Sequence, residues 1–255
     1  MNGDTVGENI EINDIGSDSS AKITIHVVHT TVKESPGTAC GFVGRKIQHP
    51  WELVNDTDGK GPRKWHDDSM HYKVPAKGEG PDLSKFVFTL KVDGCCTVAR
   101  GGKLFMRYEP SDPGKKLPVG AFLVGESNSK KPIYMRPLDP KIDKHAAKCM
   151  DVLEKRGTKV EDGSYELLGE KVNNNYHKLT GVHLSPHSTI VFAFSPEQKT
   201  FAFLEYFLKQ VGIEGFVCYN PETLEMYKIR RGCFAGLTWP PKWDEKVVSV
   251  RPHLL

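Results

Sequence analysis

The chain has 255 residues, of which 38% are hydrophobic and 26% charged, and its formal net charge is +3. These values are ordinary for a soluble globular protein, and the small net charge alone does not indicate a nucleic-acid-binding protein. The sequence contains no run of about 18 apolar residues, so we expect no transmembrane helix. Its acidic, polar start lacks the features of a signal peptide, and we expect an intracellular protein, cytoplasmic or nuclear.

The first third of the chain predicts little regular structure. Residues 1–20 are polar, acidic and poor in aromatic side chains, which is typical of a disordered tail. The alternation of residues 23–28 predicts a strand. The segment that follows is rich in Gly, Pro, Lys and Asp, and Trp51 and Trp65 are its candidate anchors. We therefore treat residues 21–85 as an N-terminal extension to which the sequence assigns no role.

The cysteines and histidines do not predict a metal site. The six cysteines form no CxxC pair, so we expect small buried residues in a reducing compartment. His66 and His71 flank two aspartates, but their spacing matches no metal-binding motif. The cysteines are Cys40, Cys95, Cys96, Cys149, Cys218 and Cys233.

The stretch 86–92 predicts a strand with one buried face and one functional face. Four apolar residues fall on one side at period two, namely Phe86, Phe88, Leu90 and Val92. Lys91 falls on the other side, where it can face a cleft.

Two glycines predict the turn of a hairpin after this strand. Gly101-Gly102 would place Arg107 opposite Cys96. If the preceding strand continued unbroken, Arg107 and Lys91 would lie on opposite faces of the sheet. A bulge or turn at Asp93-Gly94 is therefore needed if both side chains share one cleft.

Two helices are predicted in the second half of the chain. The first spans residues 142–156, and Gly157 ends it. Its apolar stripe comprises Ile142, Ala146, Cys149, Met150 and Leu153. The second begins at Ser195, where Gln198 completes a capping box, and it ends at Gly212.

Two strands follow the second helix, at residues 213–219 and 224–230, with a turn between them. In the last strand Lys228 and Arg230 share a face, so two cations project together. Arg230-Arg231 is one of several basic pairs that we interpret mainly as surface groups able to contact phosphates.

The string Lys91-Val92-Asp93-Gly94 is the first chemical landmark. A K-x-D-G string alone is weak, and its simplest structural explanation is a strand that ends in an Asp-Gly turn with an exposed lysine. The K-x-D-G string becomes a more specific indication of function when the polar residues that follow it along the chain are considered with it. These residues are Arg107, Glu166, Glu214, Lys228 and Arg230.

This order resembles the covalent nucleotidyltransferase superfamily, which comprises ATP-dependent DNA and RNA ligases and RNA capping enzymes. The resemblance covers about residues 86–240. It implies an α+β fold, a ligase-type nucleotidyltransferase domain (ATP-grasp-like) with antiparallel sheets flanked by helices, here over residues 21–255. The stretches that look most like the eukaryotic Rlig-type RNA ligases are KVDGCC, YELLGEKVNNNYH, IEGFV and GLTWP.

Two departures from the superfamily pattern bear on the function. Arg230 stands where many relatives have a second lysine, and arginine keeps the charge with a different geometry. Only 24 residues follow Arg231. We therefore expect no C-terminal OB domain of the kind that DNA ligases and capping enzymes carry, because such a barrel needs five strands.

The resemblance assigns Lys91 as the nucleophile that takes AMP from ATP. A phosphoramidate on lysine is stable enough to persist and labile enough to pass the AMP on. The obstacle is protonation, because only roughly one lysine amine in a few thousand is uncharged at neutral pH. Lys228 and Mg²⁺ are the candidates for favouring the neutral amine and offsetting the charge of the leaving pyrophosphate.

The other motif residues are assigned to the nucleotide and the metal. Glu166 would hydrogen-bond to the ribose, and Glu214 would help to position Mg²⁺, for which Mn²⁺ is an alternative. Arg107 would contact the nucleotide or an RNA phosphate. An aromatic side chain should stack on the adenine, and Phe192 and Phe194 are the candidates. The remaining expected nucleotide contacts are Asp93, Gly94, Lys228 and Arg230.

We therefore expect an ATP-dependent RNA ligase that joins RNA 5′-phosphate and 3′-hydroxyl ends through a lysyl-AMP intermediate. Its partners would be ATP and RNA ends, without a membrane. The alternatives are a capping-type guanylyltransferase, which the short tail disfavours, a non-catalytic RNA-binding module on the same fold, and a small-molecule adenylyltransferase. The sequence leaves the physiological RNA, its pathway and the oligomeric state open.

Overall fold

The computed structural model describes most of the chain from residue 46 onward and two earlier segments. The described residues are 7–13, 22–29, 46–55, 70–76, 78–112, 114–127, 130–242, 247–248 and 250–255. The predictions for Trp65, His66 and Cys40 fall outside the described residues.

The contacts between residues divide the chain into two compact units. Unit 1 comprises Met1–His29, Ile47–Lys91 and Ile190–Val250. Unit 2 comprises Thr30–Lys46, Val92–Thr189 and Arg251–Leu255. The division falls between Lys91 and Val92, inside the K-x-D-G motif, whereas the sequence predicts one domain with an N-terminal extension.

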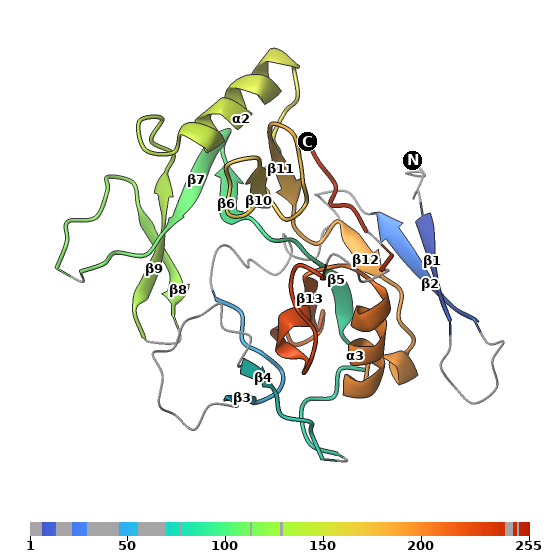
Figure 1. Cartoon of the computed structure of the whole chain (residues 1–255). Coiled ribbons are helices and arrows are strands. Elements are labelled where there is room, and N and C mark those ends of the chain that lie inside the picture. Colours follow the sequence, from blue (N-terminus) through green and yellow to red (C-terminus); the bar gives the residue numbers. More distant parts are fainter. Residues whose placement is uncertain are drawn as a thin grey trace. The chain divides into compact units, whose positions relative to one another are not determined.

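Unit 1 is built on a six-stranded antiparallel sheet. In spatial order its strands are β1 (Gly7–Asn13), β2 (Lys22–His29), β12 (Ile190–Phe192), β5 (Val87–Lys91), β13 (Gly215–Tyr219) and β14 (Met226–Arg230). Helix α3 (Phe201–Gln210) lies beside β5 and β13 (Figure 1). β1 is a strand in a stretch whose composition predicts disorder, and β2 confirms the predicted strand at residues 23–28.

An aromatic core joins α3 to this sheet. The rings of Phe192 and Phe216 lie 5.1 Å apart, and those of Phe207 and Phe216 lie 5.7 Å apart. Phe88 of β5 has no exposed surface and packs 5.6 Å from Phe216. The period-two alternation predicted for this strand is confirmed, because its apolar residues are buried and Lys91 is partly exposed.

A second aromatic group anchors the segment before β5. Strands β3 (Leu53–Asn55) and β4 (Met70–Tyr72) form a two-stranded sheet. Tyr72 packs 5.2 Å from Trp51 and 5.0 Å from Phe234, measured between ring centroids, and Trp51 packs 4.9 Å from Phe201 of α3. The prediction that Trp51 is an anchor is confirmed.

Unit 2 is built on a second six-stranded antiparallel sheet. In spatial order its strands are β11 (Val182–Pro186), β10 (Gly163–Gly169), β6 (Cys95–Arg100), β7 (Lys103–Tyr108), β9 (Pro132–Pro137) and β8 (Phe122–Glu126). Helix α2 (Lys144–Lys155) packs on this sheet beside β11 (Figure 1). The described part of the chain is thus α+β, with mostly antiparallel strands and two α-helices.

Alternation along β10 separates a core face from a polar face. Tyr165 and Leu167 belong to the buried cluster that includes Cys149 and Leu153 of α2. Because side chains alternate along a strand, Glu166 between them points to the opposite face. The polar side chain of this strand is therefore kept away from the helix.

The helix predictions need two corrections. Ile142 precedes α2 and is 68% exposed, so it does not belong to the apolar stripe. The second helix does not start at Ser195: a short 3-10 helix, η1 (Pro196–Gln198), comes first, and α3 begins at Phe201. Thr200 has an extended backbone and separates η1 from α3. Its hydroxyl oxygen caps α3 by accepting the N–H of Phe203 at 3.3 Å.

Arg231 is fully buried and joins the end of β14 to α3. It opens the short helix η2 (Arg231–Cys233). Its guanidinium donates to the backbone carbonyls of Leu208 and Val211 at the end of α3, and to that of Thr238. A cation there suits the negative end of the helix dipole. The interpretation of Arg231 as a surface phosphate contact is therefore wrong.

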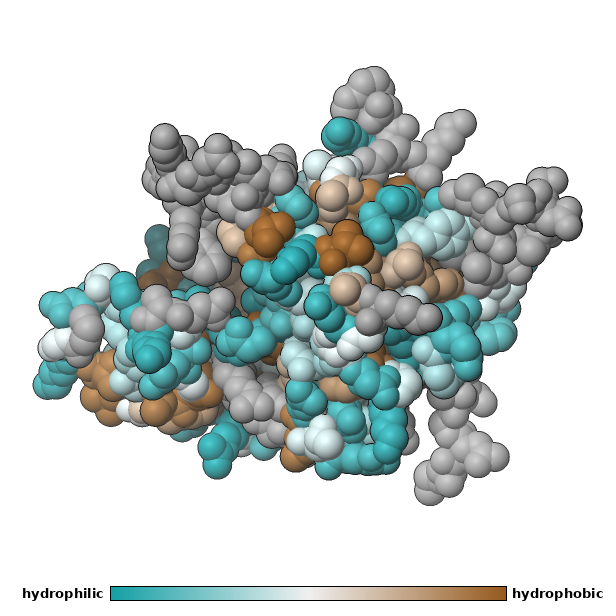
Figure 2. Space-filling view, turned by 90° about the horizontal axis from the view of Figure 1, so that it is seen from below, coloured by the Kyte–Doolittle hydropathy of each residue, from teal (hydrophilic) through white to brown (hydrophobic). Residues whose placement is uncertain are grey.

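None of the helices in the described part of the chain has the length and apolar character needed to cross a membrane. On the face drawn in Figure 2, hydrophobic residues form separate brown groups among hydrophilic ones. Exposed large hydrophobic residues include Val119 and Val74. Exposed apolar side chains of this kind are common on folded proteins.

Replacing Arg231 by Met is expected to lower the free energy of unfolding by roughly 3 kcal/mol, because buried carbonyls would lose their charged donor. Denaturant titration measures the change. Arg156→Met is the control, because Arg156 is an exposed arginine at the end of α2, and it should change stability by less than about 0.5 kcal/mol. Equal stability of the two variants would contradict this role.

Candidate functional site

Three predicted site residues of unit 1 meet at one end of its sheet. The register places Gly215 opposite Lys91 of β5 on one side and opposite Arg230 of β14 on the other. Lys91, Gly215 and Arg230 therefore form one row, and the glycine, which has no side chain, leaves space between the two cations. Glu214 directly precedes Gly215 and lies against both of them.

A buried carboxylate organises this row. Glu214 is 2% exposed, and its oxygens lie 2.6 and 2.7 Å from Nζ of Lys91. Nε of Arg230 lies 3.4 Å from the same carboxylate. A buried charge requires such partners, because its removal from water is costly.

The cations exceed the carboxylate in charge. Lys91 and Arg230 surround the single negative charge of Glu214, and both are partly exposed. Lys228 faces the same side of β14 as Arg230, two residues earlier, as the sequence predicts. The excess positive charge and the partial exposure favour an anionic ligand such as a phosphate chain.

His49 joins this group, and the sequence gives no local signal for it. The N–H of Lys228 donates to the carbonyl of Gln48 at 2.8 Å, which brings His49 alongside β14. Burial, followed by the charges of Lys228, Arg230 and Lys91, lowers the pKa of His49 to about 3. The imidazole is therefore neutral at physiological pH.

The unit 2 residues of the motif form a separate group around Glu166. One carboxylate oxygen of Glu166 accepts the N–H of Gly94 at 3.1 Å, and the other lies 2.7 Å from Nε2 of His187. Nδ1 of His187 lies 2.6 Å from the hydroxyl of Ser164. Since a carboxylate only accepts, a neutral His187 ring carries its hydrogen on Nε2 and accepts the Ser164 hydroxyl. The chain Ser164–His187–Glu166 therefore fixes the carboxylate.

Gly94 is fixed by close contacts as well as by this hydrogen bond. A side chain at this position would meet the Leu167 carbonyl oxygen and would lie 2.7 Å from Cγ of Glu166. The side-chain amide of Asn173 donates to the carbonyl of Gly94 at 2.6 Å, and the N–H of Asp93 donates to His177. The strand thus ends at Lys91, and β6 starts at Cys95 in the other sheet, which confirms the predicted turn of the chain at Asp93-Gly94.

Arg107 lies on the same face of the unit 2 sheet as Glu166. The register of β6 with β7 pairs Thr97 with Met106, so Cys96 and Arg107 come next in the predicted register, and Glu166 pairs with Cys96 on its other side. Nη2 of Arg107 lies 3.0 Å from Glu109, yet neither this atom nor Nε makes a hydrogen bond within the described part of the chain, and both are buried. Buried guanidinium N–H groups without a hydrogen bond fit an anionic ligand.

The structure contradicts the assignment of Phe192 and Phe194 to base stacking. Phe192 is 2% exposed, and Phe194 is 6% exposed. Their rings pack on each other at 5.7 Å and on Phe207 of α3. Period-two alternation could not separate them from core residues, because a stacking ring and a core ring give the same pattern.

The donor set around Glu214 fits Mg²⁺ only together with a nucleotide. The described residues contain no group of three or more His, Cys, Asp or Glu side chains arranged to hold a metal ion. Mg²⁺ is commonly bound through one or two carboxylates plus substrate phosphates and waters. Glu214 would supply such a carboxylate, and phosphate oxygens would have to supply further ligands.

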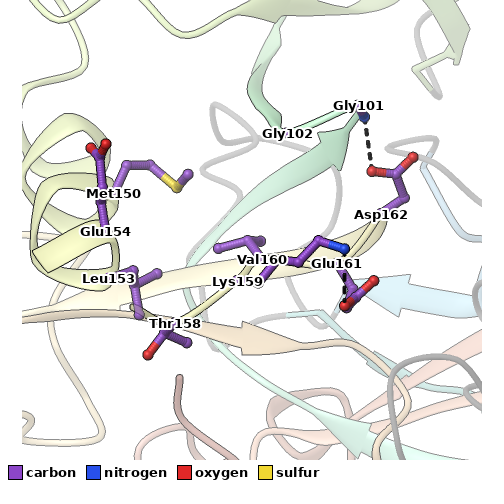
Figure 3. A pocket seen from close by; sticks show the side chains of 10 residues that line it. All are labelled: Gly101, Gly102, Met150, Leu153, Glu154, Thr158, Lys159, Val160, Glu161 and Asp162. Atoms are coloured by element: carbon purple, nitrogen blue, oxygen red, sulfur yellow. Dashed lines mark hydrogen bonds and ion pairs between the residues drawn. The ribbon is translucent and has the colours of Figure 1, made fainter. Parts of the chain in front are cut away.

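A pocket of about 710 Å³ in unit 2 is lined by none of these residues. Side chains of α2 and of residues 158–162 line it beside the β6–β7 turn (Figure 3). Glu154, Glu161 and Asp162 contribute three acids against one base, Lys159, which is ion-paired with Glu161, and Asp162 accepts the N–H of Gly101 at 2.8 Å. This acidic lining disfavours a polyphosphate ligand.

Comparison with known proteins gives no match to a family model or to a curated protein. The residues and their geometry therefore carry the assignment of function. The group around Glu214 is the best-supported candidate site. Its ion pairs, the strand register and the burial of Glu214 all bring the cations to one buried carboxylate.

Replacing Gly215 by Ala is expected to lower the free energy of unfolding by about 2 kcal/mol or more. The added Cβ would collide with the Ile229 carbonyl oxygen, and the φ of +147° is unfavourable for a side chain. Thermal and denaturant unfolding measure the effect. Gly114→Ala is the control, because its Cβ would lie 3.5 Å from the Asp112 carboxylate in ordinary contact. Unchanged stability of the Gly215 variant would contradict the close-packed row.

Acidification is expected to destabilise the fold through His49. Its pKa is lowered from 6.5 to about 3 on folding, so between these values the unfolded chain binds more protons. His49 therefore stabilises the fold fully above pH 6.5, and this contribution falls by at most about 1.4 kcal/mol per pH unit as the pH drops through that window. Unfolding measured from pH 4 to 7 should depend less steeply on pH in His49→Asn. Parallel pH profiles would refute a buried neutral His49.

Proposed function

We propose that this protein is an ATP-dependent RNA ligase whose Lys91 forms a lysyl-AMP intermediate. The observation that carries the proposal is the Lys91–Glu214 pair, in which the amine lies 2.6 Å from a buried carboxylate. Arg230 contacts the same carboxylate, so positive charge lies beside Lys91 where the phosphates of a nucleotide would need it. The end of a rigid strand holds the nucleophile in place.

In the first step, Nζ of Lys91 attacks the α-phosphorus of ATP. The nitrogen–phosphorus bond forms while the bond between the α-phosphorus and pyrophosphate breaks. Glu214 orients Nζ and is the adjacent acceptor for its proton. Lys228 and Arg230 offset the charge on the departing pyrophosphate. Mg²⁺, held through Glu214 and the phosphates, would supply further neutralisation of that charge.

Within unit 2, Glu166 and Arg107 have groups suited to a ribose and to a phosphate. Glu166 uses one acceptor site on each oxygen for Gly94 and His187, and a carboxylate has about four such sites. Acceptor capacity therefore remains for ribose hydroxyls. Arg107 is ion-paired with Glu109 through Nη2, and its Nε, which makes no hydrogen bond within the described residues, is the group it offers to a phosphate.

The proposal includes the fold and the later steps of the reaction. The fold would be a ligase-type nucleotidyltransferase domain, of which the two antiparallel sheets and their helices are the coarse features. AMP would pass from Lys91 to an RNA 5′-phosphate. A 3′-hydroxyl would then attack that phosphate and displace AMP, sealing the strand.

Incubation with labelled ATP and Mg²⁺, followed by denaturing electrophoresis, tests the first step. We expect covalent label on the wild-type protein and only background on Lys91→Ala. Glu214→Gln should lower the labelling rate by about 10²-fold, because Nζ loses its charged partner. Lys85→Ala is the matched control, since Lys85 lies near the other end of β5 and pairs with Glu222 in an exposed ion pair.

Each other outcome of this experiment is informative. Label that persists on Lys91→Ala would refute the proposal. A preference for GTP would indicate a capping-type guanylyltransferase instead. If the wild-type protein stays unlabelled after pyrophosphate has removed any AMP it already carries, a non-catalytic RNA-binding module is favoured.

A further inference from the structure

The His49 ring contacts a buried tyrosine and lies close enough to the cations of the unit 1 group for their charges to act on it. Its Nδ1 is 2.8 Å from the hydroxyl of Tyr72, and the two rings meet edge to face at 5.5 Å. Tyr72 is 2% exposed, so the aromatic packing around it holds the hydroxyl in place. The charges that act on His49 are those of Lys228, Arg230 and Lys91.

The hydrogen bonds of Tyr72 determine which nitrogen of His49 carries the hydrogen. The Tyr72 hydroxyl accepts the N–H of Arg230 at 3.1 Å, so its own proton goes to another partner, and the acceptors near it are the Lys228 carbonyl, Nδ1 of His49 and the sulfur of Cys233. The Lys228 carbonyl lies 3.4 Å away, whereas Nδ1 of His49 lies 2.8 Å away. The shorter distance favours donation to Nδ1. The neutral ring then carries its hydrogen on Nε2.

We propose that His49 is a further nucleotide-binding residue, which donates its Nε2–H to a phosphate oxygen of the nucleotide beside Lys91, Lys228 and Arg230. This inference rests on the proposed function. Within the described part of the chain, Nδ1 has a hydrogen bond and Nε2 has none. Nε2 is thus the ring atom available to a ligand.

A neutral donor suits this position physically. A fourth positive charge would be repelled by the neighbouring cations, and its burial would add a desolvation penalty. A neutral N–H adds a hydrogen bond to a phosphate oxygen without either cost. The pKa of His49, which burial and the three cations lower to about 3, keeps the ring in this form.

Two variants separate the two nitrogens of the ring. In His49→Asn the amide reaches the position of Nδ1 and retains a partner for Tyr72, but nothing occupies the position of Nε2. In His49→Gln the amide reaches the position of Nε2 and retains the distal donor. His26→Asn is the control, because His26 is an exposed histidine of β2 in the same unit.

The experiment measures binding of α,β-methylene-ATP and of inorganic triphosphate by calorimetry, together with the melting temperature. We expect His49→Asn to weaken both ligands roughly 10- to 100-fold, the loss that corresponds to one hydrogen bond to a charged group. Its melting temperature should stay within a few degrees of wild type. His49→Gln should bind within about threefold of wild type, and His26→Asn should not differ from wild type.

Two results would overturn the inference. One is wild-type affinity in His49→Asn. The other is that both His49 variants melt at a lower temperature and bind the ligands more weakly, which would show that His49 only supports Tyr72 structurally. Labelling of the same proteins with ATP separates these results from failure of the proposed function, since that failure would leave the wild-type protein itself unlabelled.

Discussion

The unit 1 site depends on the burial of one carboxylate. Glu214 is almost inaccessible to water, so its charge requires cations at contact distance. The sheet register supplies them by placing Lys91 and Arg230 in one row on either side of Gly215. Arg231 fixes the backbone by donating its N–H to the Glu214 carbonyl at 2.7 Å. The arrangement is therefore built into strand pairing and does not depend on a flexible loop.

Both units separate packing from chemistry by the alternation of side chains along strands. In unit 1, Phe88 and Phe216 face α3, whereas Lys91 and Lys228 belong to the other face. In unit 2, the neighbours of Glu166 pack in the core with α2, and Glu166 itself points away. A helix thus covers one face of each sheet in the described part of the chain, and the polar groups gather on the opposite face.

Apolar packing also supports the polar site from outside the motifs. Tyr72 belongs to a group of aromatic rings with Trp51, Phe201 and Phe234, which positions its hydroxyl against β14. That hydroxyl in turn holds His49. The segment before β5, to which the sequence assigns no role, therefore contributes a neutral group to a cluster of cations. Neutrality and orientation both follow from burial and hydrogen bonding, which are properties of the folded chain.

The sequence by itself determined the local elements with strong patterns: the alternation in β5, the Gly101-Gly102 hairpin, the strands β13 and β14, and most of α2. It also predicted that Lys91, Glu214 and Arg230 lie together, because the order of polar residues along the chain resembles a known motif series, and the side chains of Lys91 and Arg230 do both contact that of Glu214. Tertiary structure alone decided that Phe192 is a core residue and that Arg231 is buried. It also decided that His49 lies beside the cations. The physical reason is that periodicity records which face a side chain takes, whereas burial and ion pairing depend on which distant strand or helix covers that face.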